Sequence, residues 1–154
     1  MQEGEQYIDI RIKSGDLDID WIRFGEGASL IPGIIQAEDY DDGGYSFKQG
    51  EFGNFKSYRK DKGVAISASD GVVHISNTSV GDWLQYTFTT QGGAFEIRVR
   101  ASAERDGIFS LSFDDGKPLS NVAVSTGGWT TYQEFIGAKV NLTPGKHTMK
   151  IHIV

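Results

Sequence analysis

The chain has 154 residues and no cysteine, so one domain is expected, and disulfides, thiolate metal sites and cysteine nucleophiles are excluded. The net charge of −6 argues against nucleic acid as a partner, because phosphate binding needs a basic surface. No apolar run is long enough to cross a membrane, so no membrane partner is expected.

Short strand patterns follow one another along the chain, separated by turn signals such as Ser-Asp-Gly and Thr-Pro-Gly-Lys. No segment keeps a helical period over three turns. We predict strands at 7–13, 16–24, 33–38, 64–67, 72–77, 82–89, 94–101, 107–113, 122–125, 130–138 and 145–154. Their number and spacing predict an all-β fold, a β-sandwich of the jelly-roll type.

The second predicted strand carries three aspartates. Asp16, Asp18 and Asp20 alternate with apolar residues, so a strand would place all three carboxylates on one face. Like charges at this spacing repel unless something neutralises them. We expect Asp16 to be solvated and look for a neutralising partner for Asp20.

A long polar stretch lies between the predicted strands at 33–38 and 64–67. Residues 41–62 are rich in glycine and contain several aromatic residues. We predict one long loop, and long loops in compact domains are usually functional.

Four stretches together resemble carbohydrate-binding module family 6. They are IIQAEDY (34–40), GDWLQY (81–86), STGGWTTY (125–132) and VNLTPGKHTMKI (140–151). They occur in the family's order, from about residue 31 to 154. In the family, the HTMKI-like strand is followed by a closing strand. DIDWIRF (18–24) is similar to that closing strand, but here it stands at the front of the chain.

The resemblance therefore implies one module over 1–154 in a circularly permuted arrangement. Residues 1–24 would fill the slot of the C-terminal strand, 25–33 would be a linker, and 34–154 would form the main body. A sandwich without this strand would expose a long edge. Two alternatives remain: the segment is the tail of a preceding module, or it is donated to a neighbouring chain in a strand-swapped dimer.

The resemblance also implies a structural calcium ion. In the family it is held by the Gln and Glu of the QAE motif and by a polar residue of the closing strand, here Gln36, Glu38 and Asp20. A backbone carbonyl from the loop before the second motif contributes, and we assign it to Arg59. Calcium takes six to eight oxygen ligands, which suits this donor set.

For the sugar site, the resemblance implies stacking on Trp129 of the TGGW motif and hydrogen bonds from the closing strand at Asp18. The family's second stacking aromatic corresponds to Asn77, so one wall of the site is missing. The 41–62 stretch offers replacements, namely Tyr45, Phe47, Phe52 and Phe55. Of these we expect Tyr45 to form the second wall.

Some family members bind glycans on a sheet face instead. The corresponding residues here are Trp83, Asp114 and either Arg11 or His152. Trp83 could equally be a half-buried sheet residue without a role in binding.

No carboxylate pair or activated nucleophile is recognisable in the sequence. The resemblance implies a non-catalytic, extracellular module that targets an appended glycoside hydrolase to plant or algal polysaccharide, either β-glucan or xylan. The alternative is a structural or scaffold β-sandwich with a decayed sugar site. Asn77 favours that alternative and Trp129 opposes it.

Overall fold

The computed structural model describes residues 18–27, 33–55, 57–59, 63–69 and 71–154. Within these ranges the chain forms eleven β-strands and two 3₁₀ turns, and it has no helix that is long and apolar enough to span a membrane. The all-β prediction is confirmed. The predicted strand at 7–13, Arg11 and Asp16 lie outside the described residues.

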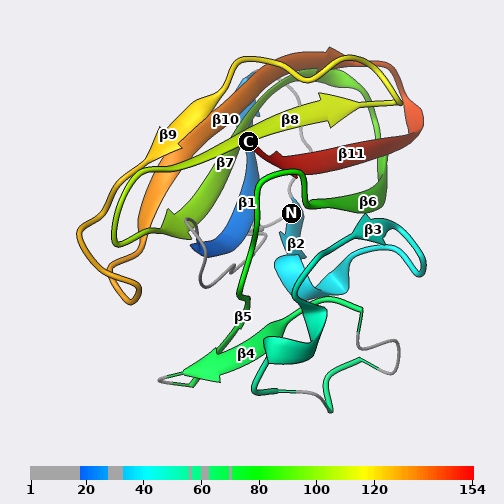
Figure 1. Cartoon of the computed structure of the whole chain (residues 1–154). Helices are drawn as coiled ribbons and strands as arrows, with labels where there is room; N and C mark the ends of the chain where they lie inside the picture. Colours follow the sequence, from blue (N-terminus) through cyan, green and yellow to red (C-terminus); the bar gives the residue numbers. More distant parts are fainter. Residues whose placement is uncertain (1–17, 28–32, 56, 60–62, 70) are drawn as a thin grey trace.

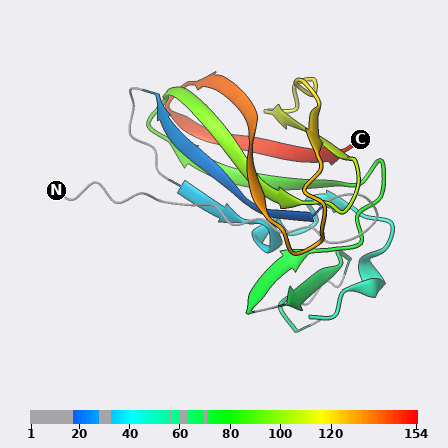
Figure 2. The ribbon, with the colours of Figure 1, turned by 90° about the vertical axis from the view of Figure 1, so that its left-hand side faces the viewer.

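Two antiparallel sheets form the sandwich (Figure 1). The six-stranded sheet has the order β10 (Gln133–Leu142), β7 (Gly93–Ser102), β1 (Asp18–Gly27), β5 (Val72–Ile75) and β4 (Ile66–Ser69), with β2 (Gly33–Gln36) paired to β1. The five-stranded sheet has the order β3 (Tyr45–Ser46), β6 (Trp83–Thr90), β11 (Gly145–Ile153), β8 (Gly107–Phe113) and β9 (Val122–Val124). Figure 2 shows β10, β7 and β1 as one layer that crosses β6 and β11 of the other.

Alternating apolar residues supply the core between the sheets. In β7, the side chains of Phe95, Ile97 and Val99 are at most 2% exposed, whereas the charged residues between them reach the solvent side. Fully burying a side chain of this kind contributes about 1.5–3 kcal/mol. The period of two that predicts this strand therefore also selects its buried face.

Strand β1 lies inside the six-stranded sheet and pairs within its own chain. It runs antiparallel to β7 from Asp18 to Gly27, pairs with β2 over Trp21–Phe24, and contacts β5 through Ile19 and Ile75. The strand continues three residues past the predicted end at Phe24, so the predicted linker begins inside it. With both edges paired, β1 leaves no open edge beside β7.

The segment predicted as one long loop contains regular structure. β3 adds a two-residue strand to the edge of β6, and η2 (Gly50–Phe52) forms a 3₁₀ turn. The prediction missed β3 because two residues are too few for an alternating pattern. Asp41 fixes this edge: its carboxylate accepts hydrogen bonds from Thr87 N at 2.9 Å and Thr87 Oγ1 at 2.6 Å.

Strand β10 begins three residues later than the predicted start at Thr130. The chain first makes a turn in which Thr131 N donates to the carbonyl of Gly128 at 3.3 Å. This turn carries the TGGW motif.

Candidate functional site

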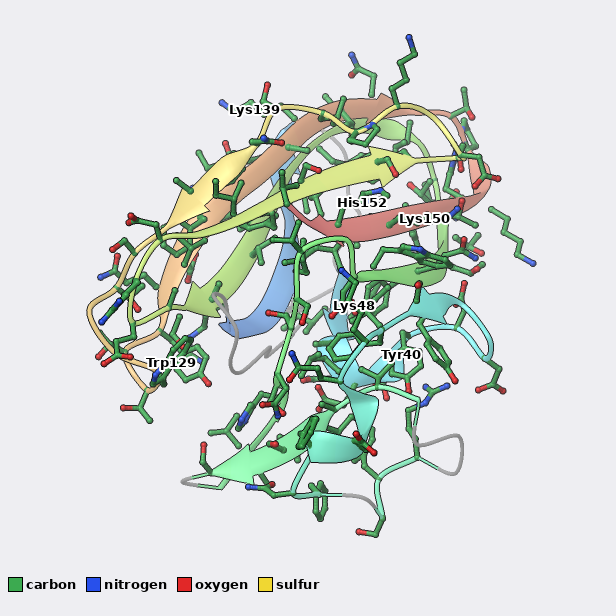
Figure 3. All side chains as sticks on the ribbon, viewed as in Figure 1. Tyr40, Lys48, Trp129, Lys139, Lys150 and His152 are labelled. Carbon is green, nitrogen blue, oxygen red and sulfur yellow. The ribbon has the colours of Figure 1, made fainter. Side chains whose placement is uncertain are left out.

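Trp129 lies in the connection between β9 and β10, at the lower left of Figure 3, and is partly exposed. Its carbonyl accepts a hydrogen bond from Ser102 Oγ at 2.7 Å, and its indole Nε1 donates to Glu104 Oε2 at 3.1 Å. Gly127 takes a φ of +77°, a backbone conformation that favours glycine. The turn therefore holds a large aromatic ring at the surface in a defined orientation.

The start of β1 lies beside this tryptophan. Asp18 is the ladder partner of Ser102, the residue that holds the Trp129 carbonyl. The fold thus brings the backbones of Asp18 and Trp129 close together. Ser102 and Glu104 have no part in the sequence prediction, because only strand register reveals that they adjoin the TGGW turn.

Asn77 follows β5 on the other side of β1. Its φ of +56° lies in the left-handed region, which asparagine tolerates better than most residues. Its Nδ2 donates to the carbonyl of Phe52 at 3.3 Å and to Ser76 Oγ at 3.2 Å. The residue at the position of the expected aromatic therefore anchors the η2 turn.

Tyr45 contacts Tyr40 and Gly63. Its ring meets that of Tyr40 edge-on, with 5.4 Å between the centroids, and a Cβ built on Gly63 would lie 2.0 Å from its hydroxyl oxygen. Figure 3 shows Tyr40 on the opposite side of the molecule from Trp129. The ring of Tyr45 is therefore packed against Tyr40 and the backbone of Gly63, and its role as a second wall stays a prediction.

Other aromatic candidates from the 41–62 stretch differ in exposure. Phe47 and Phe55 are partly buried and pack against the core. Phe52 is 60% exposed, and its carbonyl is the one that Asn77 binds. Among the three, only Phe52 presents its ring mainly to solvent.

A second cluster lies on the outer face of the five-stranded sheet. Trp83 and His152 are cross-strand partners, and the ammonium of Lys150 lies 5.2 Å from the centroid of the Trp83 ring. His152 Nε2 and Ser112 Oγ are hydrogen-bonded at 2.8 Å, and burial lowers the pKa of His152, with a further contribution from the charge of Lys150. Figure 3 shows Lys150 and His152 side by side along β11.

Asp114 lies at the end of β8 and is hydrogen-bonded to β11. One carboxylate oxygen accepts from His147 Nδ1 at 2.6 Å, and the other accepts from Thr148 N at 2.9 Å. His147 Nε2 also donates, to the carbonyl of Thr143 at 2.8 Å. Asp114 is therefore held by His147 and Thr148 of β11, and Lys150, which the prediction did not name, is a further basic group beside Trp83.

The residues expected to hold calcium converge at η1 (Ala37–Asp39). Gln36 pairs with Trp21, so the preceding residue, Asp20, brings its backbone to the start of this turn. Glu38 is 4% exposed. Arg59 reaches the same turn through Nη1, which donates to the carbonyls of Glu38 at 3.2 Å and of Tyr40 at 2.7 Å.

Glu38 lies next to a buried hydrogen bond. The buried hydroxyl of Tyr86 donates to the carbonyl of Ala37 at 2.9 Å, and burial together with the charge of Glu38 raises the pKa of Tyr86. No group of three or more His, Cys, Asp or Glu side chains arranged to hold a metal occurs among the residues with described side chains, and the side chain of Asp20 is outside that set. A buried glutamate, a glutamine and backbone carbonyls are nevertheless donors that suit calcium.

Asp82 of the GDW motif has a structural role. It is 1% exposed, and its two carboxylate oxygens accept hydrogen bonds from Lys48 N at 3.0 Å and Ser79 N at 2.8 Å. Lys48 Nζ binds the carbonyl of Val80. Burial raises the pKa of Asp82. Within this motif, Asp82 therefore holds two loops together.

A family model described as carbohydrate binding module (family 6) matches residues 56–154. A search among curated proteins finds no match. Similar solved structures include a family 35 carbohydrate binding module from Clostridium thermocellum, which is 24% identical with a TM-score of 0.41 and covers 46% of this chain and 57% of that one. The native structure of such a module from the same organism is 19% identical with a TM-score of 0.48 and covers 56% and 70% of the two chains.

The Podospora anserina GH26-CBM35 β-(1,4)-mannanase is 17% identical with a TM-score of 0.49, covering 75% of this chain and 23% of that one. The present chain thus spans less than two thirds of the first of these three structures and less than a quarter of the mannanase.

Proposed function

Because the chain belongs to carbohydrate-binding module family 6, whose members are non-catalytic, we propose that it targets an attached glycoside hydrolase to plant or algal polysaccharide, either β-glucan or xylan. It binds the glycan in the cleft beside Trp129. The hydrolase acts outside the cell, where such polysaccharides are found. The module binds the polysaccharide, and the attached hydrolase domain cleaves it.

One observation carries this proposal, namely the partly exposed Trp129 ring, which is fixed by Ser102 and Glu104 beside the start of β1. Sugar rings present apolar C–H faces that stack on flat aromatic side chains, and nearby polar groups bind their hydroxyls. Asp18 supplies such a group on β1. A neutral glycan is also compatible with the net charge of −6.

The test is a titration of intrinsic tryptophan fluorescence with oligosaccharides from laminarin, xylan, mixed-linkage glucan and agarose. We expect a saturable shift with a β-glucan or xylan series. Trp129→Ala should abolish it with little change in thermal stability, and Leu119→Ala, which truncates an exposed apolar side chain away from both tryptophans, is the control. Unchanged binding by W129A would refute the assignment of the binding site to Trp129. A folded wild-type protein without any response would favour the scaffold alternative.

The outer face around Trp83 is a second candidate site for the same ligands. The aromatic ring, Lys150 and His152 support it, because they combine a stacking surface with hydrogen-bonding groups. Loss of part of the binding in W83A, with the remainder lost in the W83A/W129A double variant, would establish two sites.

We also propose that calcium stabilises the module, held by the side chains of Gln36, Glu38 and Asp20 and by the carbonyl of Arg59. When bound, the ion would neutralise the carboxylates of Glu38 and Asp20. The burial of Glu38 beside the residues named above supports this proposal, since a carboxylate is a ligand that suits calcium. A rise in melting temperature with calcium, reversed by chelator and absent in Glu38→Gln, is the expected result. Identical melting with calcium and with chelator would refute it.

The position of β1 supports a circularly permuted arrangement of the family fold. The strand that resembles the family's closing strand pairs with β7 and β2 of its own chain. A strand-swapped dimer would use the same pairs between two chains. Light scattering on the purified chain tests this, and a monomer is the expected result.

A further inference from the structure

Glu104 lies at the edge of the Trp129 indole. It is exposed, and its Oε2 accepts a hydrogen bond from the indole Nε1 at 3.1 Å. The N–H of an indole lies in the plane of the ring, and a hydrogen bond prefers to be nearly linear. The carboxylate therefore stands beside the ring, close to its plane, and does not itself cover either ring face.

Three consecutive residues after β7 bind the turn that carries Trp129. Ser102 Oγ donates to the carbonyl of Trp129 at 2.7 Å, and Glu104 accepts from its indole. Between them, Ala103 N donates to Thr126 Oγ1 at 3.0 Å, and Thr126 N donates to the carbonyl of Ala103 at 3.0 Å. The backbone of Glu104 and the backbone of Trp129 are thus held in one frame, which fixes the carboxylate relative to the ring.

Orienting the indole does not by itself require a charge. A glutamine oxygen would accept the same N–H, so the bond explains an orienting role for either residue. A carboxylate adds two properties, because it only accepts hydrogen bonds and it carries a negative charge. Both properties act on any ligand that stacks on the ring of Trp129.

A neutral sugar gains from this carboxylate. When the C–H face of a sugar lies on an aromatic ring, its hydroxyl groups point outward around the edge of the ring. A carboxylate has about four acceptor positions, of which the indole takes one, so it can also accept from a sugar hydroxyl. Hydrogen bonds to a charged acceptor are roughly twice as strong as those between neutral groups.

A uronic acid would bring a second carboxylate to the same edge. The two like charges repel, and neither carboxylate can donate a hydrogen bond to the other. Arg105 and Asp106, both exposed, follow Glu104 with opposite charges, so the three residues together keep a net negative charge. The net charge of −6 on the whole chain acts in the same direction.

We propose that Glu104 is a specificity-determining residue of the Trp129 site. Its carboxylate accepts a hydrogen bond from a hydroxyl of a neutral glycan stacked on the indole, and it rejects glycans that carry a uronic acid at that place. This inference rests on the proposed function and narrows the ligand to neutral β-glucan or to xylan without acidic branches. Glu104 lies 25 residues from Trp129 and outside the TGGW motif, so the motif does not identify it.

The test compares neutral oligosaccharides with matched acidic ones by calorimetric titration. The acidic probes are gluco-oligosaccharides oxidised at C6 to glucuronic acid and xylo-oligosaccharides with a glucuronic acid branch. Glu104→Gln removes the charge and keeps an acceptor for the indole, whereas Glu104→Ala removes both. Glu134→Gln is the matched control, because it removes the same charge from β10, where the carboxylate pairs with Arg98 at 3.5 Å.

The wild type should bind the neutral series about tenfold or more tightly than the acidic series, because like charges in contact strongly disfavour a ligand. E104Q should weaken neutral binding several-fold and reduce this preference about tenfold. E104A should also weaken neutral binding, and E134Q should keep the preference of the wild type. Raising the salt from about 20 mM to 1 M should tighten acidic binding by the wild type but not by E104Q, because salt screens the repulsion.

The outcomes separate a specificity role from an orienting one. If E104Q weakens both series equally and leaves their ratio unchanged, Glu104 only orients Trp129 and the inference is overturned. Equal affinity of the wild type for both series also overturns it and leaves the proposed function standing. A wild-type protein that binds no oligosaccharide, or W129A with unchanged binding, overturns the inference and the proposed site together. Because Glu104 is exposed, E104Q should melt close to the wild type, which a thermal scan checks.

Discussion

The hydroxyl of Ser102 donates a 2.7 Å hydrogen bond to the carbonyl of Trp129, and Ser102 is also the ladder partner of Asp18. One buried serine at the end of β7 thus joins the two residues that the family resemblance assigns to sugar binding. The bond ties the TGGW turn to the sheet at the point where β1 begins.

Ser102→Ala should weaken sugar binding several-fold and lower stability by about 1 kcal/mol, the usual net value of one hydrogen bond. The reason is that the Trp129 carbonyl loses its donor while the ring keeps its bond to Glu104. Calorimetric titration and denaturant unfolding measure the two effects. Ser102→Thr, which retains the hydroxyl, is the control, and equal affinity of S102A and wild type would contradict a positioning role.

Asp82→Asn should destabilise the protein by about 1–3 kcal/mol, the cost of leaving a buried polar group unsatisfied. Each carboxylate oxygen accepts one backbone N–H, from Lys48 and from Ser79. An asparagine has one acceptor oxygen, so its amide nitrogen would face an N–H donor.

Chemical denaturation of D82N measures this cost. Sugar affinity should stay within about twofold of wild type, because the clamp does not touch the Trp129 turn. Loss of binding in a stably folded D82N would instead assign Asp82 to the ligand site.

Removal of residues 1–27 should prevent cooperative folding. Without β1, strand β7 loses its pairing partner on one side, and the pairing of Ile19 with Ile75 is also lost. The sheet is then interrupted in its middle. Circular dichroism melting of the shortened chain is the measurement. A sharp transition at the wild-type temperature would show that the segment merely adheres, as expected for the tail of a preceding module.

Local patterns predicted much of this fold. The alternation in β7 identified both the strand and its buried side, and the TGGW motif identified the exposed tryptophan, since its glycines and ring are adjacent in sequence. The backbones of Asp18 and Trp129 both adjoin Ser102, and their shared role in sugar binding stays a prediction. The strand and the turn both depend on residues that are close together in the sequence.

Contacts between distant residues were not predictable in the same way. Ser102 and Trp129 are 27 residues apart, and Asn77 and Phe52 are 25 residues apart. Each contact depends on which strands are neighbours and in which register, and composition does not specify this. The sequence also does not tell that Phe47 and Phe55 pack against the core whereas Phe52 is exposed. Lys150 was missed for the same reason.

The His147–Asp114 pair should make stability depend on pH. The hydrogen bond to Asp114, followed by that to the Thr143 carbonyl, raises the pKa of His147 above its ordinary value of 6.5, and the same pair lowers the pKa of Asp114 below 3.8. A histidine with a raised folded-state pKa contributes stability below pH 6.5 and loses it as the pH rises through the folded value. Asp114 contributes stability above its ordinary pKa of 3.8 and loses this contribution as the pH falls through its lower folded-state pKa.

The contribution of the pair should therefore be largest between about pH 4 and 6.5 and should decline above that range. His147→Gln removes the titrating group, so wild type should melt above H147Q at pH 5, with a smaller difference at pH 9. Melting curves of both proteins across this range measure the difference. Asp114→Asn is the matched variant, because it keeps the shape of the side chain and removes the charge that holds the imidazolium. A difference between wild type and H147Q that stays constant with pH would mean that His147 stabilises the β10–β11 hairpin by packing on Phe88, whose ring centroid lies 5.9 Å away, rather than by its charge.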